Sequence, residues 1–522
     1  MQTGRIILYT DEPEITRENV ITVLREAVIE HELNRQRIQY LLDYDAGKQP
    51  LQRVKTVRPD VNCECVDNIA NEVTEFWCGF AFGSPITLVQ RGSVKENISE
   101  AVTMLNDCYD SVKIKSKTQE LGRYLEIGGI GCVYIDINTD WKDGDSYFTL
   151  DVLDPRTSFV VRSNYYPDHR IMLGVTYRQN KRTKEKNYTC FTKDMRFEIL
   201  EQSKILNGEV VTSKWGHKER SGEMNPIGYV PIVEYIRSYD RTGVFERQIS
   251  EMDNINLMIS DFSNDVDQNT QVIWHGNDVV FPTEIVEDAN GNKIETTKRP
   301  QANEWVLTYT PENGKSPTIS PLTVDYDYSG MLNNIVTRRS LVLQKCNVPQ
   351  RNDNSGGSTG VAMSDATGWS AAETAASKQQ MIIDSCKMEE VKVVLAAISA
   401  SPDIKPGNPL LALKSCDMQP NIKRQKTYEM TTKANAIATL LSHGIYGEDV
   451  LNAIPFFDDP NEVWQRSKVL IEKYQKSIFD KDSNNQAEGG SDEKAPNLDR
   501  NMQDLSDQIE NSPLIDKSRT EK

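Results

Sequence analysis

Apolar residues recur at three- and four-residue steps through several long stretches of the chain, and this spacing predicts amphipathic helices. The first helix is expected over residues 15–45, where an Asp-Ala-Gly sequence forms a typical stop. Two more helices are expected over residues 62–80 and 95–126. Short runs rich in β-branched and aromatic residues follow and predict strands. The predicted strands are residues 132–137, 146–153, 158–162, 171–178, 187–193, 196–201 and 231–235. Helices that precede a mostly antiparallel sheet place the chain in the α+β class.

A second helical pattern begins near the centre of the chain. A helix over residues 248–271 would be about 36 Å long at 1.5 Å per residue. Its apolar positions form a seam made of Met252, Ile255, Ile259, Phe262 and Val266. Such a seam packs equally well against the core of the same chain or against a neighbouring subunit.

A small β insertion is predicted between this helix and another long one. Its expected strands are residues 272–274, 279–281, 284–287, 294–297 and 305–309. The Asn290-Gly291 pair between two of these runs is a strong hairpin signal. The second long helix is expected over residues 328–346, with Leu332, Val336, Leu343 and Cys346 on one side.

The C-terminal third begins with a polar segment, residues 351–370, which is too long and too rich in Gly, Ser, Asn and Asp for an ordinary connector. A helix over residues 371–400 follows, and Ser370 and Glu373 fit a capping box at its start. Further helices are expected between residues 421 and 479, including 427–442 and 460–479. From Asp480 onward acids outnumber bases and large apolar residues are few, which predicts disorder.

Composition excludes several classes of function. The 522 residues carry 60 Lys and Arg against 77 Asp and Glu, a net charge of −17, which argues against tight gripping of nucleic acid phosphates. The charge is compatible with a passage through which DNA moves without sticking. No apolar run approaches the roughly 20 residues that span a bilayer, and acids end the N-terminal apolar patch, unlike in a secretory signal. Nine scattered cysteines do not suggest a disulfide framework, so we expect a reducing, intracellular compartment.

The motifs give little support to an enzyme. The stretch Gly356-Gly357-Ser358-Thr359-Gly360 fits G-x-S-x-G, but a nucleophile elbow needs a buried strand directly before it, and residues 349–354 are too polar to form one. We expect a flexible loop there, with a hydrolase using Ser358 as the alternative.

Cofactor and metal motifs are also missing. No Walker A pattern occurs, and Gly128–Gly131 precedes a strand, the wrong order for dinucleotide binding. Cys63 and Cys65 lack a second ligand pair at metal spacing. We therefore expect no enzymatic activity, cofactor or metal.

The order of several short motifs carries a family resemblance. Tyr40–Gly47 precedes a helix that runs into Gly79–Thr87, a later long helix contains Ser260–Asp265, and a glycine-rich loop precedes another long helix. This order, over roughly residues 20–480, resembles the portal proteins of tailed bacteriophages, in particular those of long-tailed phages of Gram-positive hosts.

The resemblance implies a portal fold with an α/β wing, long stem helices, a small β clip and a helical crown. The implied segments are residues 1–245 (N-terminal helices and wing), 246–272 (stem helix), 273–322 (clip), 323–348 (stem helix), 349–370 (tunnel loop), 371–400 (long wing helix), 401–480 (crown) and 481–522 (disordered acidic tail).

The resemblance also implies residues for each role. Tunnel-loop residues expected to face DNA are Arg351, Asn352, Asp353, Ser358, Thr359, Met363 and Trp369. Acids expected in the stem lumen are Glu251, Asp253, Asp261, Asp265 and Asp267. Residues expected to dock a motor or adaptor at the clip are Glu284, Glu287, Asn290, Lys293 and Trp305. Arg351 either touches phosphate transiently or pairs with Asp353.

The implied function is a ring of about twelve subunits at one capsid vertex, assembled in the host cytoplasm and retained in the virion. Double-stranded DNA would pass through it non-specifically, driven inward by a terminase large subunit and released later through the tail. Further implied partners are the major capsid and scaffolding proteins, whose procapsid assembly the ring would nucleate, and a head-completion adaptor. A capsid adaptor is the remaining alternative, although adaptors are usually much smaller.

Overall fold

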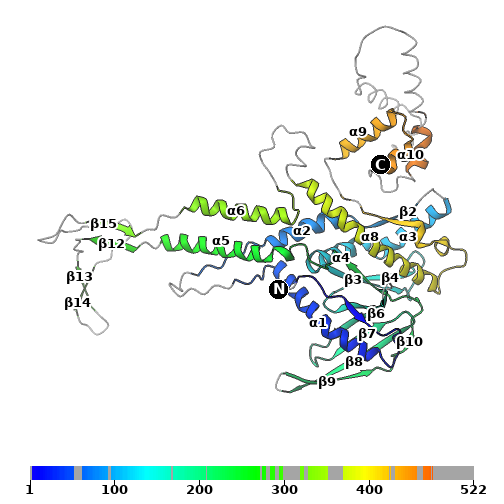
Figure 1. Cartoon of the computed structure of the whole chain (residues 1–522), viewed down its shortest axis with the longest axis horizontal. Helices are drawn as coiled ribbons and strands as arrows, with labels where there is room; N and C mark the ends of the chain where they lie inside the picture. The colour runs from blue at the N-terminus through cyan, green and yellow to red at the C-terminus, as the bar shows by residue number, and fades with distance from the viewer. Residues whose placement is uncertain are drawn as a thin grey trace, which may run out of the picture. The chain divides into compact units, whose positions relative to one another are not determined.

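The computed structural model has an α+β fold, as expected (Figure 1). It describes residues 3–51, 62–91, 96–165, 169–206, 209–270, 273–277, 283–287, 293–297, 318–322, 327–350, 368–422, 424, 429–454, 463–471 and 473. The chain divides into two compact units, Met1–Tyr428 and Glu429–Lys522.

Four helices open the first unit, and two of the expected boundaries are wrong. The helices are α1 (Val20–Asp45), α2 (Ile69–Phe82), α3 (Glu96–Ser111) and α4 (Ile114–Gly128). Helix α2 begins at Ile69 because Asn68 caps it, accepting a hydrogen bond from Asn71 N at 3.3 Å. The single helix expected over residues 95–126 is broken at Lys113, whose φ of 60° is left-handed.

Helix α4 ends in a glycine turn that connects it to the first strand of the core sheet. Gly129 has φ +76° and donates its N–H to Leu125 O at 2.9 Å, a left-handed helix cap. A Cβ at this position would lie 2.3 Å from Arg241 O, so only glycine fits. The glycine-rich run therefore has a structural role here.

Alternating strands build the larger sheet, within the segment expected to form the wing, residues 1–245. The described strands form a seven-stranded sheet in the order β1-β5-β6-β7-β8-β10, with β9 paired to β8. Strand β1 is parallel to β5 and the other pairs are antiparallel. Their bounds are β1 (Leu8–Thr10), β5 (Ser158–Ser163), β6 (Ile171–Gln179), β7 (Lys186–Phe191), β8 (Met195–Leu206), β9 (Glu209–His217) and β10 (Glu223–Met224). Strand β9 was not expected. Helix α1 covers this sheet, with Val20 and Leu24 packed against Leu173 and Val175.

A second, smaller sheet lies at the centre of the first unit. It has the order β11-β3-β4, with β3 (Ile130–Ile137) between β11 (Ile232–Ile236) and β4 (Phe148–Leu153). Side chains of α2, α3 and α4 pack with it in the largest apolar core. A two-stranded pair, β2 (Thr87–Gln90) with β16 (Met418–Asn421), lies at one side, after the short helices η2 (Pro409–Ala412) and η3 (Ser415–Asp417).

Two long helices bracket short strands, as expected. Helix α5 (Ile249–Thr270) follows η1 (Glu246–Gln248) and lies beside α6 (Tyr328–Lys345); both run toward the strands at the left of Figure 1. The strands are β12 (Ile273–Asn277), β13 (Thr283–Glu287), β14 (Lys293–Thr297) and β15 (Thr318–Leu322), of which β15 was not expected. Antiparallel pairing of β13 with β14 confirms the hairpin. The strands expected at 279–281 and 305–309 lie outside the described residues.

The seam of α5 packs against the core of the same chain except at its last position. Met252 and Ile255 are fully buried, whereas Val266 is 41% exposed. The apolar side expected for α6 is partly wrong, because Leu332 and Val336 are more than half exposed. The inward positions of α6 are Ile335, Val342 and Leu343, and Cys346 is buried just after the helix.

Helix α8 (Trp369–Ala400) crosses the core and begins without the expected capping box. Gly368 occupies the N-cap position with no side-chain cap. Ser370 instead lies in the first turn, where its carbonyl accepts a hydrogen bond from Thr374 Oγ1 at 2.9 Å. Glu373 pairs with Arg424 and lies five residues after the N-cap, beyond the N3 position that a capping box requires.

A buried charged cluster fixes the middle of α8. Lys387 and Glu390 are each 2% exposed and form an ion pair. Tyr109 Oη donates to Glu390 Oε1 at 3.0 Å, and Tyr235 Oη donates to Oε2. Burial raises the pKa of both tyrosines well above 10, so they remain donors. The cluster joins α8 to α3 and β11.

The second unit contains α9 (Glu429–Ser442), α10 (Gly447–Ala453) and helical residues at 463–471. The two helices expected in this region are confirmed within the described residues. Tyr446 and Trp464 pack with ring centroids 5.3 Å apart. The predicted disordered tail lies outside the described residues.

Removing one partner of the buried ion pair should destabilise the first unit strongly. Lys387→Met leaves the Glu390 carboxylate buried without its cation, which costs about 3–5 kcal/mol. The same substitution at Lys392, an exposed lysine of the same helix, should cost less than about 0.5 kcal/mol. Urea unfolding of both variants measures the difference; equal losses would contradict the role given to the cluster.

Stability should also fall with acid because of one buried histidine. His31 is 2% exposed, donates Nε2–H to Arg156 O at 3.2 Å and stacks on Phe159. Burial lowers its pKa from 6.5 to about 4. The unfolded chain therefore binds the proton first, and stability decreases as pH falls from 6.5 to 4, by up to about 1.4 kcal/mol per pH unit.

His31→Gln keeps a donor but does not titrate, so the loss of stability between pH 6.5 and 4 should be smaller in this variant. Melting temperatures across that range test the effect. Parallel curves for the wild type and the variant would show that His31 does not contribute.

Candidate functional site

The start of α5 is held by a buried ion pair. The Arg5 guanidinium is paired with Glu246, and the two side chains are 0% and 8% exposed. The same carboxylate accepts hydrogen bonds from Gly4 N at 3.0 Å and Gly243 N at 2.9 Å. The N-terminal segment and the residues before η1 therefore fix where the helix leaves the wing.

A row of polar side chains on α5 binds the extended segment 62–67. Cys63 N donates to Asn264 Oδ1 at 2.7 Å, Cys65 N to Ser260 Oγ at 3.0 Å and Asp67 N to Asn256 Oδ1 at 2.9 Å. The three side chains are at most 1% exposed. Two extended residues advance about 6.8 Å and four helical residues about 6 Å, so alternate N–H groups meet successive turns.

This row explains why the helix expected from residue 62 does not form there. Helical geometry would turn these N–H groups toward their own carbonyls, whereas the extended chain gives them partners on α5. Asn256, Ser260 and Asn264 were not predicted as a unit. Their i, i+4, i+8 spacing, which places three uncharged polar side chains on one side of the helix, was the available signal.

The five acids predicted for the stem are not equivalent. Glu251 pairs with Arg338 of α6 at 2.6 Å, and Asp253 accepts a hydrogen bond from Tyr44 Oη at 2.8 Å. Burial raises the pKa of Asp253 above its usual 3.8. These two carboxylates are therefore engaged within the chain. Of the other three, Asp261 is exposed, and Asp265 and Asp267 are half-buried.

Helix α6 carries arginines that tie it to other elements. Asp327 caps its start by accepting from Gly330 N at 2.8 Å. Arg339 Nε donates to Asp67 Oδ2 at 2.9 Å and the same guanidinium pairs with Glu72. Arg338 and Arg339 were missed by the sequence analysis, because surface arginines at i, i+1 give no signal of their distant partners.

The structure describes the two ends of the predicted tunnel loop. Gln350 Nε2 donates to Ser340 O at 2.6 Å, which fixes the chain as it leaves α6. At the other end Trp369 is the first residue of α8, and its ring lies 5.9 Å from Phe76 and 5.8 Å from Phe80. Whether Trp369 also faces DNA stays a prediction. Arg351, Asn352, Asp353, Ser358, Thr359 and Met363 lie outside the described residues.

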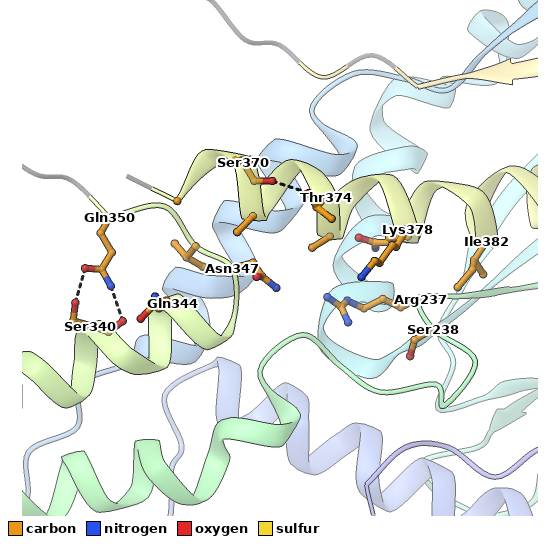
Figure 2. Close-up of a pocket in the computed structure, with 15 residues that line it drawn as sticks. Arg237, Ser238, Ser340, Gln344, Asn347, Gln350, Ser370, Thr374, Lys378 and Ile382 are labelled. Carbon is orange, nitrogen blue, oxygen red and sulfur yellow. Dashed lines mark hydrogen bonds between the residues drawn. The ribbon is translucent and has the colours of Figure 1, made fainter. Parts of the chain in front are cut away.

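A polar groove lies between these two ends (Figure 2). Its volume is about 1090 Å³, and α6, α8 and the segment after β11 line it. Arg237 and Lys378 are its two basic residues, and Figure 2 shows their tips converging. None of the described residues that line it is Asp or Glu. The sequence analysis missed both bases, since α8 and β11 are far apart in the chain.

The expected clip residues are only partly described. Glu284 and Glu287 belong to β13 and Lys293 to β14, and the Cα atoms of Glu287 and Lys293 are register partners. Asn290 and Trp305 lie outside the described residues. Docking at this surface stays a prediction.

Among the described residues, no group of three or more His, Cys, Asp or Glu side chains could hold a metal ion. No described helix is long and apolar enough to cross a membrane.

Comparison with known proteins supplies the family. None of the curated proteins matches the sequence. Residues 26–477 match the family described as phage portal protein, SPP1 Gp6-like. Proteins of this family are structural rather than enzymatic, which argues against the alternative of a hydrolase that uses Ser358. Because the match extends over most of the sequence and accords with the α+β fold, the chain belongs to the phage portal protein family, whose members form the DNA-passing ring at the portal vertex of the capsid.

Proposed function

We propose that this chain assembles as a ring of about twelve subunits in which α5, α6 and the tunnel loop surround the DNA. The observation that carries the proposal is the arrangement of α5 and α6, which lie side by side between the wing and the β13–β14 hairpin. Both are tied to the wing by polar contacts, α5 through Glu246 and α6 through Arg339. A long polar segment bounded by Gln350 and Gly368 follows directly.

The acidic residues of α5 support a channel through which DNA slides without being held. A duplex that slides must avoid many simultaneous phosphate contacts, because each adds salt-dependent affinity. We assign the repulsive role to Asp261, Asp265 and Asp267, the three predicted stem acids in the C-terminal half of α5. Arg351 is then the single base of the loop that would touch phosphate transiently.

The family supports proposals for the remaining partners. We propose that residues 273–322 dock the terminase large subunit during packaging and a head-completion adaptor afterwards. Glu284, Glu287, Asn290, Lys293 and Trp305 are the candidate contacts. The wing is the candidate surface for the scaffolding and major capsid proteins, through which the ring would nucleate procapsid assembly in the host cytoplasm.

A charge reversal in the stem tests the channel. Asp261→Lys would place a cation from every subunit against the passing phosphates, so packaging should slow by about tenfold at low salt and recover as salt rises. Asp261→Asn removes the charge without adding a cation and should change packaging little.

The matched control is Asp140→Lys, the same charge change at an exposed position of the wing. It should package like the wild type. Procapsids carrying each variant portal, supplied with terminase and DNA, provide the measurement. Normal packaging by Asp261→Lys would show that this side of α5 does not face the channel.

A further inference from the structure

Two cations, Arg237 and Lys378, line the groove at the ends of the tunnel loop, and only Arg237 has a carboxylate partner among the described residues, the buried Glu126. Other basic residues nearby have carboxylate partners: Arg338 pairs with Glu251 and Arg424 with Glu373. Lys378, by contrast, is exposed and makes neither a hydrogen bond nor an ion pair with any described residue. Glu126 balances one of the two positive charges, so the described residues leave the groove with one positive charge in excess.

The Arg237 guanidinium is already oriented for a ligand. Its Nε donates to Glu126 Oε2 at 2.7 Å, and its Cζ lies 5.9 Å from the centre of the Trp77 ring. Glu126 is fully buried and is held in turn by Gln379 Nε2 at 2.5 Å. The two terminal amino groups of Arg237 point to the groove, where Lys378 adds a third donor group (Figure 2).

This donor arrangement matches an oxyanion with two acceptor oxygens. A planar guanidinium fork binds carboxylate or phosphate with paired hydrogen bonds, and a nearby ammonium adds a point charge. Gln344 and Asn347 also line the groove and supply neutral donors. The ligand class is therefore a carboxylate or a phosphate.

One observation and one physical argument favour a protein carboxylate over a DNA phosphate as the ligand. The site is a concave groove between α6 and α8, which a segment of polypeptide can enter and a stiff duplex cannot. An oriented guanidinium and an ammonium that gripped phosphate in every subunit would also resist the sliding that a conduit requires.

We propose that the groove is an inter-subunit docking site, in which Arg237 and Lys378 receive a carboxylate from an acidic segment of the neighbouring copy of this chain. The family forms rings, and a chain with 77 acids against 60 bases offers each groove an acid-rich neighbour. The proposal rests on the ring assembly described above. It places a subunit contact at the base of the tunnel loop, so that each loop is anchored beside the next subunit.

The first experiment measures how much salt dissociates purified rings of the full chain. Lys378→Glu should reduce the NaCl concentration at the midpoint to about half that of the wild type, because the groove then repels the incoming carboxylate. Lys378→Arg should restore the wild-type midpoint. The control is Lys193→Glu, the same charge change at an exposed lysine of the wing, which should leave the midpoint unchanged. Mass photometry across the salt series counts rings and subunits.

The second experiment identifies the partner directly. Rings reassembled from ¹⁴N- and ¹⁵N-labelled subunits are treated with a carbodiimide, which joins a lysine amine to a carboxylate in contact with it. Cross-linked peptides from Lys378 should contain one light and one heavy partner, which only a contact between subunits can produce.

Three outcomes would overturn the proposal. Cross-links from Lys378 that are entirely light or entirely heavy would assign the carboxylate to the same chain. An unchanged salt midpoint in Lys378→Glu, with reduced DNA passage, would assign the groove to phosphate. An unchanged midpoint and no cross-link would leave the groove without an anion; in all three cases intact rings would leave the conduit proposal standing. Wild-type protein that forms no rings would instead contradict the conduit proposal itself.

Discussion

Two buried carboxylates, Glu126 and Glu390, determine where α8 lies, and the position of α8 sets the geometry around the tunnel loop. Glu390 joins α8 to α3 and β11 through two tyrosines and Lys387. Glu126 joins it to α4 and to Arg237 through Gln379. An apolar helix face alone tolerates a shift of one turn, whereas buried polar partners fit a single register. Three turns of α8 separate the two contacts, so both translation and rotation of the helix are restricted.

Buried polar contacts also fix the position of α5. Asn256, Ser260 and Asn264 of α5 accept hydrogen bonds from backbone N–H groups and not from charged side chains. The extended segment 62–67 therefore follows the helix for more than two turns. The pair of Arg5 with Glu246 fixes the other end. A helix held in this way can extend from the rest of the first unit without a complete apolar coat, which agrees with the exposure of Val266, Leu332 and Val336. In a ring those side chains are available to neighbouring subunits.

Local patterns were sufficient to predict α5, α6 and the β13–β14 hairpin, because each depends on apolar periodicity or on turn residues close in sequence. Local patterns gave wrong predictions where contacts with residues distant in the sequence determine the backbone conformation. Residues 62–68 have a helical pattern in sequence, but Asn256, Ser260 and Asn264 provide hydrogen-bond acceptors for the backbone of the extended chain. Ser370 and Glu373 match a capping box in sequence, but the N-cap is Gly368, two residues before Ser370.

The candidate site also has parts that were predictable from the sequence and parts that were not. The segment between Gln350 and Gly368 was recognisable from composition, and the family from the order of motifs. The groove was not, because Arg237 and Lys378 come from a strand end and a helix that are neighbours only in the fold. The roles of Arg351 and of the other tunnel-loop residues stay predictions, since they lie outside the described residues.

The central claim is that α5 and α6 form the inner wall of a ring-shaped conduit. Cryo-electron microscopy of the purified full chain, at a resolution that traces helices, tests it most directly. The account predicts rings of about twelve subunits with a central opening wide enough for a duplex, α5 and α6 along the opening and the groove of each subunit against its neighbour. Rings with these two helices at the outer rim, or discrete dimers with no opening, would contradict it.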